Sequence, residues 1–343
     1  MRRARLACAF VCCLLPFAQA ADGPAHTMRT THPDIAAKNL AYVIDRARRA
    51  TQLDPSNVIA HQQLVEHLML RFQMHGEFDD LAEADDASRL LAERLPAAAQ
   101  AQLLRASVLR LQHRYADACA VLLTLEDEQS QPVVMLQRQS VAVASGRASS
   151  VIHAIRTQAA QNPSYATLTR LAAALGELGD LEAADQMYAA ALDAYTDVSP
   201  YAVAWVQFQR AGLWREQSPS RAVGLYQAAL ARVPDYLAAN VHLAEVTSEL
   251  GDRKGAIDRL TEVASASTDP DVHAVLYRML TEGAGEATAA EERRARADEL
   301  FQPWLQRFPY AIKHHASEFY ETLDIPNDQL APEACLATGQ AAG

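Results

Sequence analysis

Prolines recur through the chain at near-regular intervals, and their spacing constrains the fold more than any other feature. A proline cannot continue a helix, because it lacks a backbone N–H and its ring clashes with the preceding turn. Helix-capping residues follow several of them, as in Pro55-Ser56 and Pro234-Asp235. Such even punctuation indicates one structural unit used repeatedly. The prolines lie at positions 55, 96, 132, 163, 200, 234, 270 and 309.

The apolar residues between these prolines follow the period of an α-helix. In the unit that follows Pro163, two stripes with i, i+3, i+4 or i+7 spacing lie on either side of Gly179. Glycine accepts the positive φ that a tight turn requires, and Gly76, Gly146 and Gly251 occupy the same place in other units. Each unit is therefore predicted to be a helical hairpin. The two stripes are Leu168, Leu171, Ala172 and Leu175, and then Leu181, Ala184, Tyr188 and Ala191.

This arrangement resembles the tetratricopeptide repeat, whose pattern is W-x₂-L-G-x₂-Y…A-x₃-F…P over about 34 residues. A small residue of the second helix recurs in seven units, and a large residue lies four positions later in all of them except the first, where Ser88 stands. The small residues are Ala84, Ala118, Val151, Ala184, Ala222, Ala256 and Ala297, and the residues four positions later are Ser88, Leu122, Ile155, Tyr188, Tyr226, Leu260 and Phe301.

The resemblance implies an all-α, right-handed superhelical solenoid of about seven helical hairpins. A lone hairpin cannot bury its apolar stripe, so the units must stack on one another. We expect a solenoid over residues 34–323, with helices at 34–54 and 310–323 closing its ends. Residues 21–33 are predicted to be a flexible linker. Residues 324–343 lack periodicity and are predicted to be a disordered tail.

The first twenty residues have the three parts of an export signal. Arg2, Arg3 and Arg5 form a positive segment, residues 6–17 are apolar, and Ala18-Gln-Ala20 is a small-residue cleavage site. The apolar segment is too short to span a membrane. We therefore predict a signal peptide over 1–20, a periplasmic or secreted mature chain, and no membrane insertion after the signal is removed.

Only Cys119 and Cys335 lie outside this segment. An exported protein with a single possible pair is not a disulfide scaffold. Cys119 falls on an expected packed helix and Cys335 falls in the expected tail. We therefore predict that both thiols are unpaired.

Composition and charge limit the function classes. Hydrophobic residues make up 50% of the chain and charged residues 21%, which is typical of a folded protein. The formal net charge is −11, and it becomes −14 without the three arginines of the signal. An acidic chain lacks the basic face that neutralises phosphates, so no nucleic-acid partner is expected.

The sequence offers no recognisable catalytic or cofactor-binding motif. It lacks the nucleophile elbow, the P-loop and the dinucleotide-binding glycine pattern. We accordingly predict no catalytic residue, no cofactor and no enzyme activity. His314 and Glu318 lie one helical turn apart, but two ligands do not make a metal site, so no metal is predicted. An alternative remains that the chain is an accessory subunit of an envelope enzyme, or a metal carrier, that uses His314 and Glu318.

The resemblance implies that a protein or peptide partner binds in the concave groove, which the first helix of each hairpin lines. We therefore predict an extracytoplasmic interaction scaffold. A further alternative is self-assembly through the ends of the solenoid. The partner-binding candidates are the first-helix residues Arg110, Arg170, His242 and Glu245, together with Trp214, which lies near a hairpin turn and is expected to be an exposed anchor.

Overall fold

The structure is a computed structural model that describes residues 30–125, 132–283, 286–320, 331–332 and 335. The predicted signal peptide, most of the linker and most of the tail lie outside these ranges. Within them the chain is helical and contains no β-strand, and no helix combines the length and apolarity of a membrane span. The helices are α1 (Pro33–Leu53), α2 (Val58–His75), α3 (Phe78–Arg94), α4 (Ala99–Leu111), α5 (Tyr115–Leu123), α6 (Pro132–Ala144), α7 (Ile152–Gln161), α8 (Tyr165–Glu177), α9 (Leu181–Asp193), α10 (Pro200–Trp214), α11 (Pro219–Leu230), α12 (Leu237–Glu249), α13 (Arg253–Ala264), α14 (Pro270–Thr281), α15 (Ala287–Arg307) and α16 (Lys313–Tyr320).

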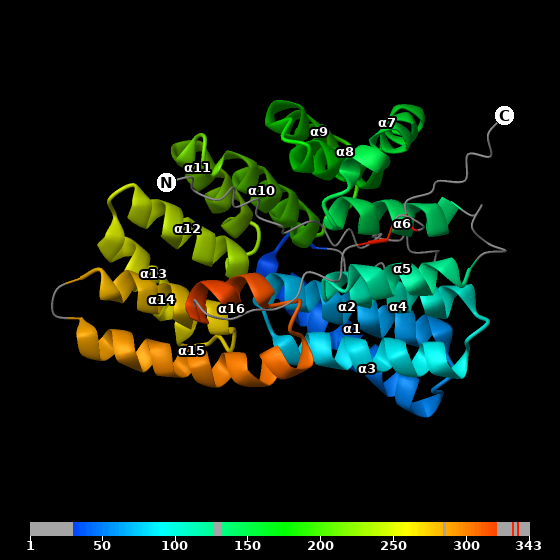
Figure 1. Cartoon of the computed structure of the whole chain (residues 1–343), viewed down its shortest axis with the longest axis horizontal. Helices are drawn as coiled ribbons and strands as arrows, with labels where there is room; N and C mark the ends of the chain where they lie inside the picture. Colours follow the sequence, from blue (N-terminus) through cyan, green and yellow to red (C-terminus); the bar gives the residue numbers. More distant parts are fainter. Residues whose placement is uncertain (1–29, 126–131, 284–285, 321–330, 333–334, 336–343) are drawn as a thin grey trace.

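Helices α2 to α15 form seven successive pairs, in which each even-numbered helix is the first and the next odd-numbered helix is the second (Figure 1), and every pair except α6 and α7 packs as a helical hairpin. A short 3₁₀ turn at Ala148–Ser150 leads into α7. Helix α1 packs on α2 and closes one end of the stack. The all-α superhelical solenoid predicted from the sequence is confirmed.

The glycines predicted to form the hairpin turns do so. Gly76, Gly146, Gly179 and Gly251 have φ angles of 70°, 75°, 82° and 105°. This is the left-handed region, where a side chain would collide with the backbone and glycine has no such cost. The four glycines therefore end the first helices of their hairpins at the positions that the sequence indicated.

The recurring small and large positions of the second helices form the core. All seven small residues and all seven residues four positions later are at most 2% exposed. Ser88, the poor match in the first hairpin, is buried as well, and its hydroxyl donates to the backbone oxygen of Asp85 at 3.1 Å. This hydrogen bond satisfies the hydroxyl, so the first unit keeps the repeat geometry despite its polar residue.

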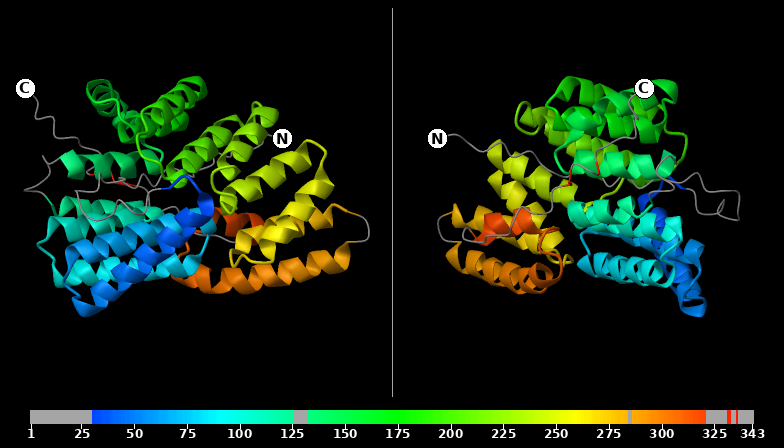
Figure 2. Two further views of the ribbon diagram at one scale, coloured as in Figure 1. Left: turned by 180° about the vertical axis from the view of Figure 1, so that it is seen from behind. Right: turned by 45° about the vertical axis from the view of Figure 1, so that its right-hand side comes forward.

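The first and last hairpins touch, which closes the superhelix. The ring of Phe78 at the start of α3 stacks on that of Trp304 in α15, with their centroids 5.2 Å apart. Arg307 donates to Asp86 at 2.8 Å. Figures 1 and 2 show the N-terminal helices lying beside the C-terminal ones in every view. The inner surface of the solenoid is consequently enclosed by the chain's own ends.

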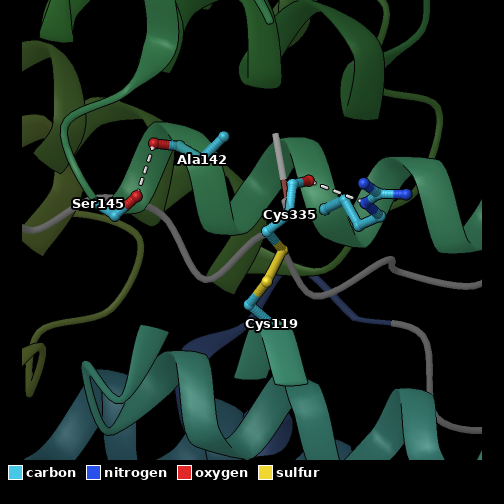
Figure 3. The surroundings of a disulfide bond; sticks show 5 residues. Cys119, Ala142, Ser145 and Cys335 are labelled. Carbon is cyan, nitrogen blue, oxygen red and sulfur yellow. Dashed lines mark hydrogen bonds between the residues drawn. A yellow bond between two sulfur atoms is a disulfide. The ribbon is translucent and has the colours of Figure 1, made fainter. Parts of the chain in front are cut away.

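The prediction of two unpaired thiols is wrong. Cys119 on α5 and Cys335 form a disulfide that joins positions 216 residues apart (Figure 3). Both residues are at most 1% exposed, and the backbone oxygen of Cys335 accepts a hydrogen bond from Nε of Arg138 at 2.9 Å. Ala331 is buried among apolar residues of α4, α5 and α6. The C-terminal segment is therefore attached at these described positions, whereas the disorder predicted for 324–343 is untested elsewhere.

Candidate partner-binding site

A network of charged side chains runs across the first helices of the last three hairpins. It begins at His242 and Glu245, which lie three residues apart on α12 and so share one face of the helix. Nδ1 of His242 is 2.8 Å from Oε2 of Glu245. Arg215, directly after α10, reaches both residues, at 2.9 Å from Nδ1 of His242 and 3.1 Å from Oε2 of Glu245.

Glu245 is the centre of this network. Burial would raise the pKa of its carboxyl, but the hydrogen bond with His242 and the charges of His242, Arg215 and Arg278 lower the pKa to about 2. The carboxylate is therefore ionised at neutral pH. Its second oxygen accepts a hydrogen bond from Arg278 on α14 at 2.7 Å, so one carboxylate joins three successive first helices.

The network continues onto the C-terminal helix α16. Arg278 donates from its other terminal nitrogen to Oε2 of Glu318 at 3.3 Å. The other oxygen of Glu318 lies 3.3 Å from Nε2 of His314. His314 and Glu318, the pair singled out in the sequence, are thus engaged with each other and with Arg278. The described residues hold no group of three or more His, Cys, Asp or Glu side chains arranged for a metal ion.

A second contact between α16 and α14 is a partly buried ion pair. Nδ1 of His315 lies 3.0 Å from Oδ1 of Asp271. Burial opposes the charge of the imidazole, but the carboxylate of Asp271 raises the pKa of His315 to about 9. The same pairing lowers the pKa of Asp271 against the effect of burial. Neighbouring Asp269, the N-cap of α14, has its pKa raised to about 7 by burial and by the charge of Asp271.

The five sequence candidates are not gathered into one site. His242 and Glu245 meet as described. Arg110 and Arg170 lie on α4 and α8 and are only 2% and 8% exposed, so their side chains offer little surface to a partner. They belong to the inner helices of other hairpins.

The prediction that Trp214 is an exposed anchor is wrong. Its side chain is 7% exposed and is part of the main apolar core. The guanidinium of Arg221 on α11 covers the ring, with Cζ 3.9 Å from the ring centroid. The position of Trp214 near a hairpin turn suggested an exposed side chain. The sequence did not show that Arg221, from the second helix of the hairpin, covers the ring.

Sequence reasoning missed Arg215, Arg278 and Asp271, although one signal was present. Glu245 and Arg278 are 33 residues apart, and each is the ninth residue of its first helix. Equivalent positions on neighbouring first helices face one another in a regular stack. An acid and a base at this spacing therefore predict an ion pair between repeats.

Comparisons with known proteins agree with this architecture. A family model described as "Tetratricopeptide repeat" matches residues 213–278. The chain resembles a chain of the crystal structure titled APC/C hetero-tetramer Cut9-Hcn1, with a TM-score of 0.52 and 13% identity, over 90% of this chain and 60% of that one. A human IFIT1 dimer with PPP-AAAA gives a TM-score of 0.45 and 16% identity, over 82% and 80% of the two chains. None of the curated protein sequences matches the chain.

Proposed function

The chain is a tetratricopeptide-repeat protein, and we propose that it acts outside the cytoplasm as a scaffold that binds a protein partner on the inner surface of α12 and α14. The repeat fold supports a role in protein–protein interaction. The finer assignment of a surface and a compartment rests on the charge network and on the disulfide.

One observation supports this surface as the binding site: Arg278 is shared between two carboxylates. This guanidinium bridges buried Glu245 and exposed Glu318, and its side chain is 46% exposed. Glu245 fixes one side of the guanidinium, because a buried ionised carboxylate needs a compensating charge. The other side can exchange Glu318 for a carboxylate from another protein. Arginine is well suited to this exchange because its planar donors match carboxylate geometry.

The compartment is supported by the chemistry of the cysteines. Disulfides form and persist in oxidising spaces outside the cytoplasm. The only two cysteines beyond residue 13 are joined to each other and buried. The export-like segment at residues 1–20 favours the same compartment.

Affinity capture tests the surface. The mature chain is used to capture proteins from an envelope extract, beside Arg278→Ala and the matched control Arg294→Ala. Arg294 is 50% exposed and pairs only locally, with Glu291, three residues away on α15. We expect a partner that is captured by wild type and by Arg294→Ala but is lost with Arg278→Ala, while circular dichroism shows that all three chains are folded at the temperature of capture. Equal capture by all three would reject this surface.

Cell fractionation tests the compartment. We expect the tagged chain in the extracytoplasmic fraction, with an N-terminus at Ala21 and no thiol that reacts with a maleimide in denaturant. An intact N-terminus and two reactive thiols in the cytoplasmic fraction would contradict the assignment.

A further inference from the structure

We propose that α16 is an internal occupant of the partner-binding surface, and that the partner is an amphipathic helix of the same chemistry that displaces it. This inference rests on the function proposed above and specifies the class of partner. It follows from how α16 is held, from where it lies, and from how it is tethered.

Helix α16 is held by three side chains of one face and by Tyr320, whose hydroxyl donates to Oδ1 of Asp298 on α15 at 2.6 Å. It has only eight residues. His315 pairs with Asp271, and Glu318 with Arg278, as described. The ring of Phe319 lies 5.3 Å from that of Phe301 and 6.1 Å from that of Tyr277. A helix this short is marginal in water without such contacts, so these contacts determine whether it stays in place.

Helix α16 packs on both helices of the last hairpin, α14 and α15. Figures 1 and 2 show it between the last hairpins and the N-terminal helices. The turn between α4 and α5 carries His113, which is close enough to α16 for its pKa to respond to His315. Burial and the positive charge of His315 lower the pKa of His113 to about 4. Helix α16 therefore covers the part of α14 that a partner would need to reach.

The contacts define the chemistry of a competing helix. His315, Glu318 and Phe319 are three and four positions apart, so they share one helical face. Their partners on the solenoid are the carboxylate of Asp271, the guanidinium of Arg278 and the rings of Tyr277 and Phe301. The expected partner helix carries a histidine or basic residue, followed three positions later by an acid and four positions later by an aromatic residue.

The chain attaches α16 at both of its ends. Helix α15 precedes it, and the disulfide of Cys335 fastens the segment that follows to α5. A ligand tethered in this way has a high effective concentration at its site. An external helix of equal intrinsic affinity therefore binds the wild-type chain poorly. Weakening the contacts of α16 exposes the surface while leaving the tether in place.

The test uses the full mature chain and a fluorescent peptide of residues 310–320 as the probe. His315→Glu places a carboxylate against Asp271. Ser317→Glu is the control, because it adds a carboxylate to the same helix at a position without a described contact. We expect His315→Glu to speed amide hydrogen exchange in α16 at least about tenfold, without changing exchange in the other helices, and to bind the peptide. Wild type and Ser317→Glu should retain protection and bind it at least about tenfold more weakly.

Glu318→Lys provides a second route, since it places a cation beside Arg278 and should also expose the surface. If α16 remains protected in both variants, or if the exposed surface does not bind the peptide, the inference is overturned. If the peptide binds but capture does not depend on Arg278, the inference about α16 stands and the proposed function fails. If capture depends on Arg278 but the peptide does not bind, the function stands and the inference fails.

Discussion

His315 on α16 and Asp271 in the first turn of α14 form an ion pair with 3.0 Å between Nδ1 and Oδ1. The pair joins α16, the last of the described helices, to the first helix of the last hairpin. The two side chains are only 22% and 17% exposed, so removing either partner leaves the other with a poorly compensated charge. The pair therefore stabilises the position of α16 that a partner helix would have to displace.

The first prediction concerns the pH dependence of this pair. The pKa of His315 is raised from 6.5 to about 9 in the folded chain. The stabilisation is therefore complete below pH 6.5 and is lost as the pH rises through 9. Asp271 has a lowered pKa, so its contribution is present above its unfolded pKa and is lost in acid. The difference in unfolding free energy between wild type and His315→Gln, from urea titrations, should shrink between pH 6.5 and 9.5. A constant difference over this range would contradict the assignment.

The second prediction concerns the disulfide. Cys335→Ala removes the link between α5 and the C-terminal segment, and loss of a native disulfide typically costs about 2–5 kcal/mol. Thermal unfolding should show a lower Tm for this variant than for wild type. Prolonged treatment with a reductant should lower the Tm of wild type toward that of the variant, and leave the variant unchanged. Equal melting of the oxidised chain and the variant would show that the link adds no stability.

The third prediction compares two glycine turns. At Gly76 an added Cβ would collide with Leu237 and Asp269, in addition to the strain of a positive φ. Gly179 has a similar φ but open space around it. Gly179→Ala should lower the free energy of unfolding by about 1–2 kcal/mol through backbone strain alone. Gly76→Ala should lower it by more. Urea unfolding of both variants measures the difference, and equal costs would mean that α12 and α14 do not press on this turn.

The fourth prediction tests the contact that closes the superhelix. Phe78 and Trp304 stack although they are 226 positions apart in the sequence. A double-mutant cycle with Phe78→Ala and Trp304→Ala should give a coupling energy of about 0.5–1.5 kcal/mol, as for other aromatic pairs. Phe301→Ala paired with Phe78→Ala serves as a reference, because no contact between these two rings is described. A coupling near zero in the first cycle would mean that the ends do not meet in solution.

The repeat architecture was predictable because its determinants are local. Ala184 and Tyr188 lie one turn apart on a single helix, and Gly179 fixes the turn just before them. Their burial depends on the hairpin and its nearest neighbours. Half of the candidate site could also be predicted from the sequence, since His242 and Glu245 share a helical face. Trp214 was misjudged because Arg221, which covers its ring, belongs to the other helix of the hairpin.

The sequence by itself thus determined the seven hairpins, their turns and the residues at their centres, since each depends on spacing within about 34 residues. The tertiary structure alone decided that Phe78 meets Trp304, that Cys119 joins Cys335, and that α16 lies on α14. These contacts depend on the rotation accumulated over all the interfaces between hairpins. The sequence pattern of one repeat does not contain this accumulated rotation. Only the folded chain therefore shows which distant residues come into contact.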